Sequence, residues 1–180
     1  MNARERFMRH MHYERPDRLP FYEFLGFWAE TCNRWYGEGL PVGMNVNDYL
    51  GFDKREGIPI DLGPIPRFVP RTLEENERYR TTVTDMGIVK RDFKTHTSMA
   101  TFIDFPVKNR EGWEKMKNRF NPYDERRYPI TWSDELLDYY RGIDHPVSLG
   151  MTGFFGEARH LMGLERLLTT FYKEPRLIHD

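Results

Sequence analysis

The sequence is poor in cysteine, in net charge and in long apolar runs. Its 180 residues include one cysteine, Cys32, so no disulfide can form within the chain. A lone thiol suits a reducing compartment, and a small buried hydrophobe is a commoner role for it than a nucleophile or a metal ligand. The 27 basic and 28 acidic residues leave a net charge of −1. No overall field therefore attracts nucleic acid or anionic lipid.

No apolar run approaches the ~18 residues that a membrane-spanning helix requires. Three of the first six residues are charged and no apolar stretch follows them, so the N-terminus does not resemble a signal peptide. We therefore expect a cytoplasmic protein with neither a membrane nor a nucleic-acid partner. Basic clusters are interleaved with acids, and we interpret them as solvated surface. They include Arg4, Arg6, Arg9 and the pair Arg126-Arg127.

The sequence also lacks the generic catalytic motifs. It has no nucleophile elbow, no P-loop, no dinucleotide fingerprint and no paired-cysteine zinc site. His10 and His12 are two residues apart in a helical segment, so they point to different faces and are not a ligand pair. We expect no metal site within this chain.

Strand-like and helical segments alternate along the chain, which indicates an α/β fold. Three apolar runs, residues 19–25, 57–62 and 146–151, predict parallel strands that are adjacent in one sheet. Helices are expected over residues 2–12, 27–36, 45–50, 109–120 and 133–140. A further helix should bury one face made of Leu164, Leu167, Leu168, Phe171 and Tyr172, because these residues recur at helical spacing.

The stretch near residues 68–94 has a different pattern. Arg80–Thr84 and Ile88–Phe93 are β-rich runs separated by a short turn that contains Gly87. This predicts a β-hairpin that lies outside the main sheet. It is polar on one side, and we interpret it as a lid or flank and not as a second domain.

The ends of the predicted strands carry the residues that chemistry could use. In an α/β barrel the site forms where strands lead into helices. Two of these ends carry a carboxylate, Glu23 or Asp61, which we take as the catalytic candidates. The alternatives are ordinary core packing with solvated acids or, for Glu23, a structural pair with a buried arginine. The substrate-binding candidates are Phe27, Trp28, Phe154, Phe155, Arg159 and His160.

Several motifs, taken in order, resemble the uroporphyrinogen decarboxylase superfamily. They are Asn2–Phe7, Pro16–Pro20, Gly150–Gly156, Met162–Leu168 and Tyr172–Pro175. The resemblance implies a (β/α)₈ TIM barrel, which typically needs ~250 residues. We therefore expect residues 1–180 to form about the first half of such a barrel, truncated before its later strands and interrupted by the hairpin excursion.

The superfamily has two branches, and the chain is more similar to the second. True uroporphyrinogen decarboxylases carry an Arg-Gln-Ala-Gly-Arg segment after the first strand, whereas residues 25–33 contain no arginine. The other branch comprises cobalamin-dependent methyltransferases. There a corrinoid carries the methyl group, and a zinc ion activates the thiol acceptor with ligands from the C-terminal half, which would lie beyond Asp180.

The resemblance thus implies methyl transfer between a corrinoid, free or on a corrinoid protein, and a small thiol acceptor. Zinc and a corrinoid would be the cofactors of the full-length protein. Uroporphyrinogen decarboxylation, and a non-catalytic ligand-binding relative or inactive fragment, are the alternatives. A homo-oligomer is left open.

Overall fold

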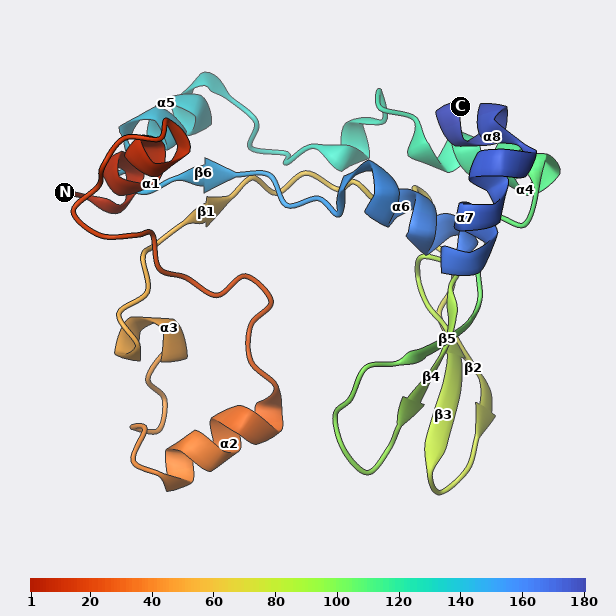
Figure 1. The fold of residues 1–180 in the computed structure, drawn as a ribbon, viewed down its shortest axis with the longest axis horizontal. Coiled ribbons are helices and arrows are strands. Elements are labelled where there is room, and N and C mark those ends of the chain that lie inside the picture. Colours follow the sequence, from red (N-terminus) through yellow and green to blue (C-terminus); the bar gives the residue numbers. More distant parts are fainter. The chain divides into compact units, whose positions relative to one another are not determined.

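The computed structural model describes residues 1–180 and divides the chain into two compact units (Figure 1). Unit 1 comprises Met1–Ile60 and Tyr128–Gly150, and unit 2 comprises Asp61–Arg127 and Met151–Asp180. Each unit therefore combines two stretches that are distant in sequence. None of the helices combines the length and the apolar character that crossing a bilayer requires.

Unit 1 contains four helices, which confirm the predictions for this part of the chain. Local capping explains where they begin. Asn2 and Glu5 form a capping box, and Asn45 and Ser133 accept hydrogen bonds from backbone N–H groups of the helices they precede. The helices are α1 (Ala3–Met11), α2 (Ala29–Gly37), α3 (Val46–Tyr49) and α5 (Asp134–Gly142).

A short parallel ladder joins the two sequence stretches of unit 1. Strands β1 (Glu56–Gly57) and β6 (Val147–Ser148) run in the same direction, with Glu56 opposite Val147 (Figure 1). The strand predicted at residues 146–151 is present at Val147–Ser148, whereas the strand predicted at residues 57–62 shares only Gly57 with β1; the two observed strands are parallel and adjacent. No closed barrel is seen.

The predicted strand at residues 19–25 is wrong. Within residues 19–25, only Phe21 is hydrogen-bonded to the segment that precedes β1. Its carbonyl accepts from Asp53 N at 2.7 Å, and its N–H donates to Asp53 Oδ2 at 2.9 Å. Further along, Glu23 Oε1 accepts the N–H of Leu25 at 2.8 Å. Side chains thus take backbone donors that a neighbouring strand would otherwise need, and the segment stays irregular.

Arg6 is buried and forms the central hydrogen bonds of a charged network in unit 1, so its interpretation as solvated surface is wrong. Its guanidinium donates two hydrogen bonds to Asp17, at 2.7 and 2.8 Å, and one to Asp53 Oδ1 at 2.7 Å. Asp53 also accepts two from Arg18, at 2.8 and 2.7 Å. One carboxylate, with its side chain 6% exposed, therefore links α1, the Pro16–Pro20 segment and the approach to β1.

Arg4 is the second arginine of this cluster with an internal role. Its Nη1 donates to the carbonyls of Arg141 at 2.8 Å and Ile143 at 3.2 Å, and its backbone N–H donates to Asp144 O at 2.9 Å. A cation at these carbonyls complements the negative end of the α5 dipole. Arg4 therefore fastens α1 to the end of α5.

Unit 2 contains a four-stranded antiparallel sheet in the order β2-β3-β4-β5. The predicted hairpin is confirmed as its central pair, and the excursion is larger than predicted because strands are added on both sides. Gly87, at φ +79°, permits the tight turn in which Thr84 N donates to Ile88 O at 2.8 Å. The strands are β2 (Arg71–Glu75), β3 (Tyr79–Val83), β4 (Val89–Phe93) and β5 (Thr101–Asp104).

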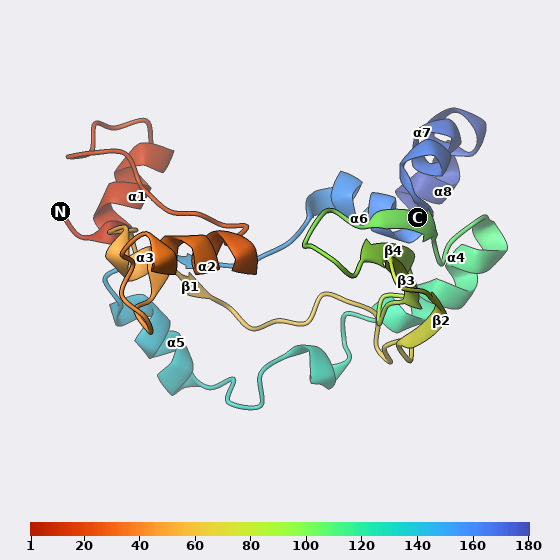
Figure 2. The ribbon, with the colours of Figure 1, turned by 90° about the horizontal axis from the view of Figure 1, so that it is seen from below.

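The helices of unit 2 gather around its apolar core (Figures 1 and 2). They are α4 (Arg110–Lys117) with the 3-10 turn η1 (Asn118–Phe120) after it, α6 (Gly153–Met162), α7 (Leu164–Lys173) and α8 (Pro175–His179). A second 3-10 turn, η2 (Glu125–Arg127), contributes no residue to this core. The buried members of the core are Val107, Met116, Met162, Leu167 and Leu177.

The predicted buried face of α7 is largely wrong. Leu167 is 0% exposed, but its partner in the core-facing turn is Thr170, whose hydroxyl donates to Arg166 O at 2.7 Å and is thereby satisfied. Leu168 is 48% exposed and Tyr172 90% exposed. The core face of α7 is set by contacts with the neighbouring helices, which the periodicity of leucines alone does not reveal.

Asp53→Asn should destabilise the chain by on the order of 3 kcal/mol, the low end of the cost of breaking a buried ion pair, because Arg6 keeps Asp17 as a partner. The matched control is Asp138→Asn in α5, whose pair with Arg141 is exposed on both sides and should contribute less than about 1 kcal/mol. Chemical denaturation measures both free energies of unfolding. Equal losses would contradict the central role of Asp53.

The same carboxylate gives this stability a pH dependence. Burial raises the pKa of Asp53, but hydrogen bonds from Arg18 and Phe21 N, with the charges of both arginines, outweigh burial and leave the pKa below its ordinary value. Its contribution is therefore complete above the unfolded pKa of about 4 and is lost as the pH falls through the lower folded pKa. Below about pH 4 the free energy of unfolding should fall less steeply in Asp53→Asn than in the wild type.

Leu167→Ala should cost about 2–5 kcal/mol, because it leaves a cavity in the core of unit 2. Leu168→Ala removes the same atoms from the next residue, which is half exposed, and should cost less than about 1 kcal/mol. Thermal and chemical unfolding of the two variants compare them directly. A larger loss in the Leu168 variant would show that the core face of α7 has been misassigned.

Candidate functional site

Asp61, one of the two catalytic candidates, lies in a turn whose geometry is fixed by hydrogen bonds. Its Oδ1 accepts from Gly63 N at 2.9 Å and from Arg67 Nη2 at 2.6 Å. Its backbone N–H donates to Arg127 O at 2.8 Å. Oδ2 accepts no hydrogen bond from the chain. The turn therefore holds a half-exposed carboxylate with one oxygen available to a ligand.

Arg127 is a buried side chain that forms hydrogen bonds with this turn. It is 6% exposed and donates to the carbonyls of Asp61 at 2.9 Å and Gly63 at 2.7 Å. It also donates to Asn121 O at 2.7 Å and Arg119 O at 2.6 Å. One guanidinium thus joins the Asp61 turn to η1 and to the segment after it, through four neutral acceptors.

Sequence analysis missed this role, since it placed Arg126-Arg127 together on the surface. The two neighbours differ. Arg126 is exposed and pairs with Asp124 at 2.6 Å, whereas Arg127 is buried among carbonyls. No pattern in the sequence distinguishes them, because the carbonyls that Arg127 binds belong to irregular segments up to 66 residues away.

Arg67 balances the charge of Asp61. Its guanidinium also lies 3.8 Å from Asp85 and donates to the sulfur of Met86 at 3.0 Å. It packs so closely over Gly63 that a Cβ there would lie 1.9 Å from Nη1, so any larger residue would displace it. Gly63 therefore leaves room for the guanidinium of Arg67 beside Asp61.

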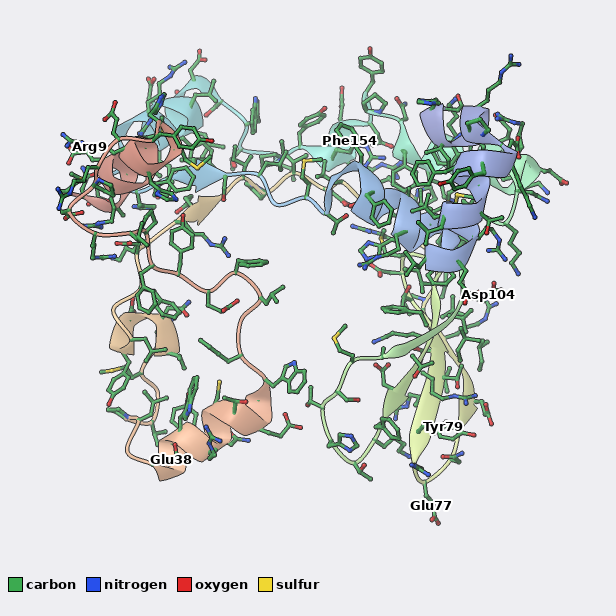
Figure 3. The ribbon with its side chains drawn as sticks, viewed as in Figure 1. Arg9, Glu38, Glu77, Tyr79, Asp104 and Phe154 are labelled. Atoms are coloured by element: carbon green, nitrogen blue, oxygen red, sulfur yellow. The ribbon has the colours of Figure 1, made fainter.

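The other predicted residues of unit 2 lie on α6, which begins at Gly153 and includes both aromatics within its first turn. Phe154, labelled in Figure 3, is 94% exposed, and Phe155 is about half exposed. Arg159 is exposed and has no ion pair, and His160 is half-buried. No hydrogen bond, ion pair or ring contact joins Asp61 to any of these four residues.

The predicted residues of unit 1 lie on both sides of the start of α2. Glu23 is half-buried in the loop before it and forms no ion pair with an arginine of unit 1, so the alternative of a structural pair finds no support there. Phe27 packs edge-on against Trp35, with ring centroids 5.0 Å apart. Trp28 occupies the N-cap position and is 54% exposed. A barrel would bring Glu23, Asp61, Phe155 and Arg159 together at the C-terminal ends of its strands. These residues belong to both units, so their convergence stays a prediction.

The zinc ligands that the resemblance implies would lie beyond Asp180 and stay a prediction for the full-length protein. Within this chain no group of three or more His, Cys, Asp or Glu side chains is arranged to hold a metal ion. Cys32 is half-buried in α2.

Comparison with protein-family models, with curated proteins and with solved structures finds no match to this chain. The site therefore has to be interpreted from its own geometry.

Arg127→Lys should destabilise unit 2 by roughly 2 kcal/mol or more, because an ammonium group cannot reach four separate carbonyls and leaves buried acceptors without donors. The control is Arg126→Lys at the exposed neighbour, for which we expect less than about 1 kcal/mol. Denaturation curves give both values. If the two substitutions cost the same, Arg127 does not support the Asp61 turn.

Proposed function

We propose that this chain forms the N-terminal part of a (β/α)₈ barrel enzyme of the uroporphyrinogen decarboxylase superfamily, which transfers a methyl group between a corrinoid and a small thiol acceptor. The observation that carries the proposal is the Asp61 carboxylate. It follows β1 by four residues, is oriented by Gly63 and Arg67, and keeps Oδ2 for a ligand.

The parallel ladder supports the barrel. Parallel neighbours need a crossover connection, and here it runs from Gly57 to Val147 and ends in the helix α5 before β6. The hydrogen bond from Asp53 N to Phe21 O places residue 21, within the predicted strand at residues 19–25, beside the segment that precedes β1. In the proposed barrel, residues 19–25, 57–62 and 146–151 would be successive neighbouring strands.

The chain's own residues would bind and orient the substrate. Asp61 Oδ2 would accept a hydrogen bond from a polar group of the substrate, while Arg67 holds Oδ1 through its hydrogen bond at 2.6 Å. Glu23 would play a similar part in unit 1. Within unit 1, Phe27 and Trp28 would offer apolar surface to a substrate. Within unit 2, Phe154 and Phe155 would offer apolar surface, and Arg159 and His160 polar contacts. A bound corrinoid supplies the transferable methyl group.

Methyl transfer is favoured over tetrapyrrole decarboxylation by the charges around α2. A substrate with eight carboxylates needs several cations to bind it. The loop that replaces the decarboxylase motif contains no arginine, and the one arginine of α2, Arg34, is engaged with Glu38 at 3.3 Å. Uroporphyrinogen decarboxylation remains the second candidate, and a non-catalytic ligand-binding relative the third.

In the full-length protein, Asp61→Asn should lower turnover by roughly 10- to 100-fold, the effect of losing one charge-assisted hydrogen bond to the reacting complex. The substituted side chain still accepts from Gly63 and Arg67 through its remaining oxygen, so the melting temperature should stay close to that of the wild type. The assay is methyl transfer from methylcobalamin to a thiol, run beside porphyrinogen decarboxylation.

The matched control is Asp85→Asn, because Asp85 faces the same arginine from 3.8 Å. It should leave turnover within about twofold of the wild type, whereas Glu23→Gln should reduce turnover as Asp61→Asn does. Wild-type rates in the Asp61 variant would remove Asp61 from the site. Turnover of porphyrinogen without methyl transfer would favour the second candidate, and no turnover of either substrate the third.

A further inference from the structure

The turn between β3 and β4 contacts the segment that carries Arg67. Phe68 N donates to Asp85 O at 2.9 Å, and Arg67 Nη1 donates to Met86 Sδ at 3.0 Å. This turn lies at the opposite end of β3 from Glu77, which is labelled in Figure 3. The turn therefore holds both the main chain beside Arg67 and its guanidinium, and all of these residues belong to unit 2.

Gly87 allows the turn and the Phe68 ring to lie in close contact. Its φ is +79°, a backbone conformation that residues with a Cβ rarely adopt. A Cβ at position 87 would also lie 2.9 Å from the nearest carbon of the Phe68 ring. The glycine is therefore needed twice, once for the turn itself and once for the ring that packs on it.

The Phe68 ring has little room to give way. Arg119 Cζ lies 4.4 Å from the centroid of the ring, and the ring also packs against the apolar core of unit 2. The chain just before it is tied as well, because Ile65 N donates to Arg119 O at 2.7 Å. A side chain at Gly87 would therefore displace Phe68 and, with it, the adjoining backbone of Arg67.

We infer that Gly87 is a positioning residue of the candidate site, which acts on Asp61 through Phe68 and Arg67. Arg67 follows the placement of Phe68 because the two are consecutive, and its Nη2 donates to Asp61 Oδ1 at 2.6 Å. By holding Phe68, the turn fixes the backbone from which the Arg67 side chain reaches Asp61. The effect on turnover rests on the proposed function, whereas the placement of Arg67 does not.

Asp85 takes part in this contact through its backbone. Its carbonyl accepts from Phe68 N, whereas its carboxylate lies 3.8 Å from Arg67 in an exposed pair, which contributes little. Replacing the Asp85 side chain therefore leaves the contact intact. Gly87 is the position of the turn at which an added side chain would disturb it.

The test introduces Gly87→Ala into the full-length protein and observes Arg67 by nitrogen NMR. Hydrogen bonds to Asp61 and Met86 hinder rotation of the guanidinium, so its two Nη signals should be distinct in the wild type. We expect them to merge in Gly87→Ala. Methyl transfer from methylcobalamin to a thiol should fall by roughly threefold to tenfold, because a small displacement of a positioned group slows the reaction.

The matched control is Gly163→Ala. Gly163 has nearly the same φ, +78°, and a Cβ there would lie 2.5 Å from the ring of Phe105. The control thus strains the backbone and crowds a ring in the same way, but Phe105 has no hydrogen bond or ring contact with residues 61–68. It should lower the melting temperature as Gly87→Ala does, with the Arg67 signals distinct and turnover within about twofold of the wild type.

Gly87→Asn separates the ring contact from the backbone strain. Asparagine tolerates a positive φ better than alanine does, so this variant should be the more stable, but its Cβ still meets Phe68. Its Arg67 signals should therefore merge as in Gly87→Ala, and melting temperatures confirm that each variant is folded.

Distinct Arg67 signals in both Gly87 variants, or merged signals in Gly163→Ala, would overturn the role of Gly87. Absence of methyl transfer in the wild type would instead refute the proposed function. The Arg67 signals would still decide whether Gly87 positions the guanidinium, so the two failures are distinguishable.

Discussion

The structure depends on buried guanidinium groups that satisfy the polar groups of irregular segments. Buried backbone carbonyls and carboxylates need donors, and long stretches of this chain lack the regular hydrogen bonds of a helix or sheet. Arg6 meets this need in unit 1 through Asp17 and Asp53. Arg127 meets it in unit 2 through four carbonyls. Each residue fixes turns that have little apolar core of their own.

The parallel ladder in unit 1 depends on these buried polar contacts. It is two residues long on each strand, and a two-stranded sheet is marginal by itself in water. Its place is secured by the contacts around it, in particular by Asp53, which binds Arg6, Arg18 and Phe21 just before β1. In unit 2 the Asp61 turn is likewise held by Arg127. The same device thus positions both the scaffold and the candidate carboxylate.

The two sheets differ in what they offer to ligands. The ladder of unit 1 leads along the chain to the Asp61 turn, where a single carboxylate oxygen is available. The antiparallel sheet of unit 2 instead presents charged side chains that pair with one another, Arg80 and Lys94 with Glu75 and Lys90 with Asp92.

By itself the sequence determined the elements that depend on near neighbours. The Asn2–Glu5 capping box, the caps at Asn45 and Ser133, and the hairpin around Gly87 were all predictable, because each involves groups within a few residues of one another. The strand-like composition of residues 57–62 and 146–151 could also be recognised in the sequence, because it too is a local property. Asp61 could be singled out as a strand-end carboxylate, but its partners could not.

Only the tertiary structure decided which charged residues are buried and which strand-like runs find a partner. Arg6 and Arg127 look like their exposed neighbours in sequence, and they differ because distant carboxylates and carbonyls surround them. Residues 19–25 have strand-like composition, yet side chains of Asp53 and Glu23 take their donors. On α7 the contacts with other helices select Leu167 and Thr170 over the remaining apolar residues. Burial is a property of the assembled surroundings, which no local pattern encodes.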